Sequence, residues 1–196
     1  MRMSWLFFSL ALSACSPVKM PIENEYKLSH YGVINRHHEQ GHKTILITHP
    51  EASSGYDTEQ MLYTIKPFSI ENFAHNAWLS PPADMLLPLL VQSVQKSRFF
   101  YAVASTTTSE LTDYRLDTQL IELQQNFLKK PSQIDFVAKI VLSDVEKNRI
   151  LASRIIEEHI TCPSDTPYGG VIAANQATEV FTKAVTQFVI TTLGKQ

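Results

Sequence analysis

Apolar and polar residues alternate along three stretches in the second half of the chain, at 114–120, 134–143 and 150–160. In the first stretch Leu116 and Leu120 occupy one side, whereas Arg115 and Asp117 occupy the other. An alternation with a period of two residues is typical of antiparallel strands that bury one face. We therefore expect three long strands, the last two joined by a turn in which Asn148 adopts a positive φ.

Two other segments carry apolar residues at the three- and four-residue spacing of a helix. The first follows Ser80 and the prolines at 81–82 and runs to about Ser97, and the second opens at Thr166-Pro167 and continues to Leu193. Proline fits a first helical turn because its missing N–H would have no partner there. The apolar positions are Leu86, Leu87, Leu90, Val91 and Val94 in the first helix, and Ala174, Ala177, Phe181, Ala184, Val185, Phe188 and Val189 in the second.

Four shorter apolar runs predict further strands, at 26–35, 44–48, 61–66 and 99–104, with a loop at 50–60. A chain of 196 residues with 44% hydrophobic residues is long enough for one well-filled core and too short for two large domains. The sequence thus predicts an α+β fold, in which two main helices pack on one face of an antiparallel β-sheet in a single domain over 26–196.

The first fourteen residues have the organisation of a signal peptide. Arg2 is followed by an apolar run at 5–12 and then by the small residues Ser13 and Ala14 before Cys15. The run is much shorter than the ~20 residues that span a bilayer as a helix. Residues 15–25, with two prolines and no apolar period, read as a tether, and ten extended residues reach at most ~33–36 Å.

Leu12-Ser13-Ala14-Cys15 resembles the lipobox of bacterial lipoproteins, in which the cysteine thiol is acylated and becomes the new N-terminus. The alternatives are an ordinary secretory peptide with a chance cysteine, or a buried N-terminal strand. Ser16 stands where retention in the inner membrane usually shows Asp, so the resemblance implies the periplasmic face of the outer membrane, with the protein lipid-anchored through Cys15. Cys162 is then left without an intramolecular partner.

The charge and the motifs argue against most other function classes. Seventeen Lys and Arg balance nineteen Asp and Glu, which is unlike the basic surface of a nucleic-acid binder. No phosphate-binding loop, dinucleotide fingerprint or nucleophile elbow occurs. We therefore expect no enzyme activity and no cofactor.

Five histidines fall within twenty residues, at positions 30, 37, 38, 42 and 49. His38 and His42, with Glu39 nearby, would share a metal ion if the segment were helical. Gly41 disfavours a helix and no complete ligand set is present, so a polar turn is the preferred interpretation and no metal site is expected.

The order of several short motifs resembles the ABC-type transport auxiliary lipoprotein family, the paraquat-inducible-type lipoproteins that accompany mammalian-cell-entry (MCE) transport systems. Besides the Cys15 lipobox, the motifs are Gly55-Tyr56-Asp57-Thr58, Met61-Leu62-Tyr63, Phe73-Ala74-His75-Asn76-Ala77-Trp78, Asp113-Tyr114-Arg115-Leu116, Arg149-Ile150-Leu151-Ala152-Ser153 and Thr166-Pro167-Tyr168-Gly169-Gly170-Val171. The His-rich turn and the unpaired Cys162 have no place in this pattern.

The resemblance implies a non-catalytic partner of an ABC permease, an ATPase and an MCE-domain protein, which move phospholipid or similar hydrophobic molecules between membranes. Tyr56, Phe73, Trp78 and Tyr101 are candidate aromatic anchors for such a partner, although a place in the core is the preferred interpretation of each. Whether the domain itself binds phospholipid is not decided by the sequence, because a lipid cavity has no local sequence pattern. The competing function is that of a structural or assembly lipoprotein that docks to an outer-membrane protein or to the cell wall.

Overall fold

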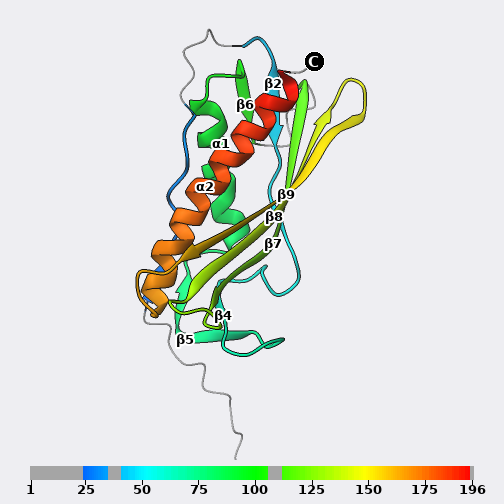
Figure 1. The fold of residues 1–196 in the computed structure, drawn as a ribbon. Helices are drawn as coiled ribbons and strands as arrows, with labels where there is room; N and C mark the ends of the chain where they lie inside the picture. Colours follow the sequence, from blue (N-terminus) through cyan, green and yellow to red (C-terminus); the bar gives the residue numbers. More distant parts are fainter. Residues whose placement is uncertain (1–23, 35–40, 106–111, 195–196) are drawn as a thin grey trace, which may run out of the picture.

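The computed structural model describes residues 24–34, 41–105 and 112–194 (Figure 1). The expected signal peptide at 1–14, the lipidation site Cys15 and most of the tether lie outside the described residues, as do His37 and His38.

Three long antiparallel strands form the framework of the sheet, as the alternation predicts. They are β7 (Tyr114–Asn126), β8 (Gln133–Asp144) and β9 (Arg149–Thr161). Asn148 has a φ of 45° in the turn between β8 and β9, which confirms the predicted hairpin. With thirteen residues at about 3.3 Å each, β7 extends for roughly 40 Å and sets the length of the molecule.

The short strands make the sheet mixed rather than antiparallel throughout, which corrects that part of the prediction. They are β1 (Asn24–Tyr26), β2 (Thr44–Ile47), β3 (Glu51–Ala52), β4 (Gln60–Thr64), β5 (Glu71–Trp78) and β6 (Ala102–Ala104). β2, β3 and β4 run parallel to β7, β6 runs parallel to β2, and β1 runs parallel to β5. Among these short strands, β4 and β5 form the one antiparallel pair in the described part of the chain. Strand direction is set by the connections, which residue alternation does not record.

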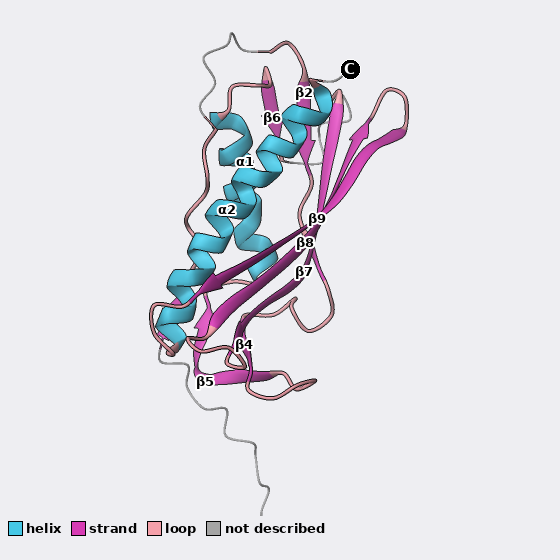
Figure 2. Cartoon of the chain, in the orientation of Figure 1, coloured by secondary structure: helices cyan, strands magenta, loops and turns pink. Residues whose placement is uncertain are grey.

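Two helices, α1 (Pro82–Lys96) and α2 (Pro167–Leu193), lie together on one side of the long strands (Figure 2). Thr166 caps α2, because its hydroxyl accepts a hydrogen bond from the Gly169 amide at 3.0 Å. At α1 the N-cap is Pro81, which makes no side-chain hydrogen bond to the first turn. No helix among the described residues is long and apolar enough to cross a membrane.

Residues 27–34, which we call the N-terminal strap, are not the strand that the sequence predicts. The strap runs between the two helices and is held by their side chains. The Gly32 amide donates to Thr182 Oγ1 at 2.9 Å, the Ser93 hydroxyl donates to the Gly32 carbonyl at 2.7 Å, and the Ser29 amide donates to Asn175 Oδ1 at 2.8 Å. A Cβ on Gly32 would lie 2.4 Å from the Glu179 carbonyl oxygen, so the close approach requires glycine.

The core lies between the helices and the inner face of the long strands. Phe136 of β8 and Phe181 of α2 meet at its centre, fully buried and with ring centroids 4.8 Å apart. The predicted apolar stripe of α2 faces this core, since Ala174, Ala177 and Val185 are also fully buried. The α+β class with two helices on one face is confirmed.

The sheet has two distinct ends, which we name from their place in Figure 1. The lower end holds the last residues of β4 and β7 and the loops that follow them, 65–70 and 127–132. The upper end holds β2, β6 and the turn between β8 and β9.

Candidate functional site

Three of the four candidate aromatic residues gather towards the lower end of the sheet. Phe73 and Trp78 of β5 line one small cavity, and Tyr56, in the loop before β4, lines a neighbouring groove of about 280 Å³. Tyr101 lies at the upper end, where its amide donates to the Lys43 carbonyl at 2.7 Å. The four residues therefore do not form a single docking surface.

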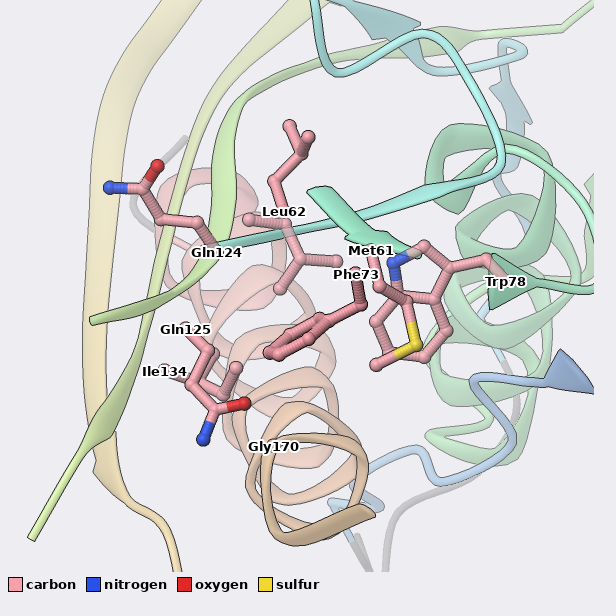
Figure 3. Close-up of a pocket in the computed structure, with 9 residues that line it drawn as sticks. Met61, Leu62, Phe73, Trp78, Gln124, Gln125, Ile134 and Gly170 are labelled. Atoms are coloured by element: carbon pink, nitrogen blue, oxygen red, sulfur yellow. The ribbon is translucent and has the colours of Figure 1, made fainter. Parts of the chain in front are cut away.

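Trp78 and Phe73 serve the core more than an interface. Trp78 is 4% exposed, and Figure 3 shows its indole beside Met61. Phe73 is half-buried, and its ring centroid lies 4.4 Å from that of Tyr63. The cavity that Phe73 and Trp78 share measures about 10 Å³, roughly the space of one water molecule, so it does not accommodate an acyl chain.

Gly170 and Gln125 close the same cavity from the side of α2 (Figure 3). The Gln125 amide donates to Ser132 Oγ at 2.9 Å and to the Thr166 carbonyl at 3.2 Å, which ties β7 to the start of α2. A Cβ on Gly170 would lie 2.4 Å from Gln125 Oε1. The two glycines at the start of α2 are thus explained by close packing, since a Cβ on Gly169 would likewise meet the Ser164 carbonyl oxygen at 2.1 Å.

Tyr56 presents a hydrogen-bond donor rather than a reactive group. Its hydroxyl donates to Gln124 Oε1 at 3.1 Å. Burial, with smaller contributions from the negative charges of Glu122 and Asp135, raises the pKa of Tyr56 to about 12. The phenol therefore stays protonated at neutral pH.

Cys162, for which the sequence offered no role, fills the core. It is 2% exposed, and its amide donates to the Ser132 carbonyl at 2.7 Å. Burial raises the pKa of the thiol above its ordinary value, so the reactive thiolate is disfavoured at neutral pH.

The histidines do not come together around a metal ion in the described part of the chain, where no group of three or more His, Cys, Asp and Glu side chains could hold one. His49 instead lies 2.9 Å from the carboxylate of Asp84 in the first turn of α1. His159 pairs with Asp135 on the adjacent strand, with 2.7 Å between Nδ1 and Oδ1.

The lower end carries an exposed apolar cluster that the sequence analysis missed. We call it the apolar tip; it comprises Ile65, Phe68, Ile70 and Leu128, which are 52%, 108%, 54% and 47% exposed. The first three belong to the loop between β4 and β5, and Leu128 belongs to the turn after β7. Monomeric soluble proteins expose single apolar side chains freely, but a cluster of them marks an interaction site. The sequence alone does not predict this cluster, because it does not distinguish an exposed phenylalanine from a buried one.

Charged side chains dominate the upper end instead. Lys43 and Asp113 lie 2.7 Å apart, and Arg115 contacts Asp117 at 2.8 Å. Arg115 and Asp117 also line a groove of about 270 Å³ with residues in and beside the β8–β9 turn, including Asp144 at the end of β8 and Arg149 at the start of β9. The side chains of Tyr101 and Ile150, also at this end, are 67% and 66% exposed.

Comparison with known proteins identifies the fold. No protein-family model and no curated protein matches this chain. Protein XCC0632 from Xanthomonas campestris, assigned to the family model DUF330, superposes with a TM-score of 0.79 at 19% identity, covering 87% of this chain and 97% of that one. An uncharacterized protein superposes with a TM-score of 0.69 at 10% identity, covering 85% and 98%. At these identities the likeness establishes a shared architecture.

A third structure is more distant. Lipoprotein GNA1162 from Neisseria meningitidis gives a TM-score of 0.39 at 11% identity, covering 71% of this chain and 98% of that one, and at that similarity it supports no inference about function.

Proposed function

We propose that this protein is a lipoprotein anchored to the periplasmic face of the outer membrane and a non-catalytic auxiliary component of an ABC-type, MCE-associated transport system. Such a system moves phospholipid or similar hydrophobic molecules between membranes. The observation that carries the proposal is the N-terminal order of Arg2, an apolar run, two small residues and Cys15, ahead of the family-like motifs of the folded domain.

The direction in which the chain enters the fold supports an anchored orientation. β1 runs parallel to β5, with Asn24 opposite Asn76 and Tyr26 opposite Trp78. Followed from Tyr26 back to Asn24, β1 therefore points along β5 towards Glu71, which directly follows the loop at 65–70. The lower end is thus the end that a short tether to a membrane would bring closest to the lipid.

The upper end then points away from the membrane, roughly 40 Å along β7. It is the surface best placed to meet a periplasmic partner. Tyr101 and Ile150 offer exposed apolar contacts there, and the groove lined by Arg115, Asp117 and Arg149 offers charges of both signs. A polar rim around a few apolar anchors is the usual composition of a transient protein interface.

A cross-linking experiment tests the proposed partner. A C-terminally tagged protein is cross-linked in intact cells and recovered from detergent extracts, and the co-purifying proteins are identified by mass spectrometry. We expect an MCE-domain protein together with an ABC permease and ATPase. Recovery of cell-wall or outer-membrane assembly proteins without any of these subunits would instead support a structural or assembly lipoprotein.

A matched pair of tyrosine variants tests where that partner binds. Tyr101→Ala alters the upper end and Tyr168→Ala the lower end, and the two side chains are 67% and 59% exposed. We expect Tyr101→Ala to lower the cross-linked yield and Tyr168→Ala to leave it unchanged. The opposite result would place the interface at the lower end.

A further inference from the structure

We infer that the apolar tip at the lower end inserts into the lipid leaflet to which the protein is anchored, and that the lysines beside it contact the phosphates of anionic lipids. The inference rests on the proposed lipid anchor and concerns a second, non-covalent contact with the same membrane.

The tip is a firm projection, not a loose loop. Two loops form it, and they are joined where the Phe127 amide donates to the Thr64 carbonyl at 2.9 Å. Beneath them, the rings of Tyr63, Phe73 and Phe127 pack together, with centroid separations of 4.4 to 6.4 Å. The three rings therefore pack where the two loops begin, at Tyr63, Phe73 and Phe127.

Phe68 is the most exposed of these side chains. It is 108% exposed, as open to solvent as in an extended chain. Its φ of 63° lies in the left-handed region, which residues with a Cβ seldom adopt. The turn at this position would suit glycine or asparagine better on conformational grounds, yet it holds a large apolar ring, and water gives that ring no favourable environment.

The charges around the tip favour a lipid surface. Lys66, Lys129 and Lys130 are exposed in the two loops. The acids that adjoin them are Glu71, which accepts a hydrogen bond from the Tyr63 hydroxyl at 2.9 Å, and Asp165, which interacts with Lys130. A positive rim around an apolar centre is the pattern of segments that sit at the boundary between headgroups and acyl chains.

The length of the tether places the membrane within reach. Cys15 precedes Asn24 by nine residues, a span of at most ~32 Å. Because β1 runs in the same direction as β5, away from Glu71, its first residue Asn24 faces the end of the domain that carries the tip. A lipid attached to Cys15 would therefore hold the tip at a high local concentration near the bilayer surface.

Tryptophan fluorescence in a bilayer measures the insertion directly. The lipidated Phe68→Trp protein is reconstituted into vesicles of phosphatidylethanolamine and phosphatidylglycerol with acyl chains brominated near the glycerol. We expect the emission added by the tryptophan at position 68, over that of the buried native Trp78, to be blue-shifted and quenched by the bromine. The matched control is Tyr101→Trp, an exposed aromatic position at the upper end, which should show neither effect. Equal, unquenched emission from both variants would overturn the inference.

Binding without the acyl anchor gives an independent measurement. The unlipidated Cys15→Ser chain is sedimented with vesicles of the same lipids. Adding Phe68→Ser should lower its partition coefficient about tenfold or more, because a phenylalanine side chain no longer leaves water. Ile150→Ser, which changes an exposed apolar side chain at the upper end, should have no effect. Charge reversal at Lys66, Lys129 and Lys130 should remove the preference for phosphatidylglycerol.

The outcomes separate the two proposals. A wild-type chain that takes up no acyl group contradicts the lipoprotein proposal. A lipidated chain whose Phe68→Trp emission stays unquenched in the vesicles contradicts only the insertion. Shielding of the Phe68→Trp side chain by a protein partner in place of lipid would also overturn the insertion and would make the tip a protein contact.

Discussion

The two ends of the sheet differ in chemistry although the same long strands build both. The lower end exposes the apolar tip with a rim of lysines, whereas the upper end exposes ion pairs such as Lys43–Asp113 and Arg115–Asp117. Between them the strands and α2 bury a continuous core around Phe136 and Phe181. The difference indicates that one end has been left suitable for lipid and the other for an aqueous partner, while the core keeps them roughly 40 Å apart.

The assignment of the lower end to the membrane depends most on Cys15, so its removal has the largest expected effect. Cys15→Ser removes the only thiol in the lipobox-like segment, and we expect no incorporation of labelled palmitate and loss of the protein from the outer-membrane fraction. Lipid labelling and membrane fractionation in high salt measure this. A variant that stays in the outer-membrane fraction after the salt wash would contradict the assignment of the lower end to the membrane. Cys162→Ser is the control and should leave labelling unchanged.

Two phenylalanines sharpen the contrast between the core and the lower end. Phe181 is fully buried against Phe136, so Phe181→Ala should lower the free energy of unfolding by about 3–5 kcal/mol. Phe68→Ala should change it by less than about 0.5 kcal/mol, because the ring has no burial to lose. Urea denaturation followed by circular dichroism measures both. A large loss for Phe68→Ala would show that the tip is part of the folded core.

The N-terminal strap joins the entry of the chain to both helices, and Gly32 is its tightest point. Gly32→Ala should destabilise the fold by about 1–3 kcal/mol, because the added Cβ meets the Glu179 backbone at 2.4 Å and Lys183 Cβ at 2.5 Å. Val33→Ala, at a neighbouring exposed position, is the matched control and should have little effect. Equal melting temperatures for the two variants would indicate that the strap is not packed between the helices.

The smallest effects come from two carboxyl groups that respond to pH with opposite sign. At the upper end, a hydrogen bond from the Lys147 amide lowers the pKa of Asp144. Its stabilisation is complete above the ordinary aspartate value of about 3.9 and is lost as the pH falls through the lowered folded value. Nearer the lower end, burial raises the pKa of Glu122, so its ionisation weakens the fold as the pH rises past about 4.3.

Melting temperatures between pH 3 and pH 7 check these signs. Asp144→Asn should lower the melting temperature at pH 7 and Glu122→Gln should raise it, and both differences should shrink towards pH 3. Shifts in the same direction at pH 7 would show that the two carboxyl groups do not differ in environment as described.

The parts of the fold with a strong local pattern were predictable. Alternation located β7, β8 and β9, Asn148 located their turn, and Thr166-Pro167 located the start of α2. The parts fixed by distant contacts were not. The strap reads as a strand, but its backbone bonds go to helix side chains such as Thr182 and Asn175. β5 was missed because Phe73-Ala74-His75-Asn76-Ala77-Trp78 has no clean alternation, and its pairing with β4 contains a register shift.

The candidate site was predictable only in part. Aromatic residue type pointed to Trp78 and Phe73, yet burial depends on the assembled sheet, and the structure turns Trp78 inward. Tyr101 is the one of the four candidates that is largely exposed. The apolar tip was not predicted, for the opposite reason. In the sequence, Ile65, Phe68 and Ile70 resemble residues of a buried strand, and only the structure shows that they are exposed.

The parallel pairing of β1 with β5 has a mechanical consequence. A pull on Asn24 along the axis of β1 loads the hydrogen bonds between Asn24–Tyr26 and Asn76–Trp78 together in shear, instead of opening them one at a time. Behind them, the strap passes the load to Ser93 and Thr182 and so to both helices. A partner that pulls on the upper end would thus apply force across the whole domain to its membrane anchor. The fold would transmit that force without first unfolding at β1.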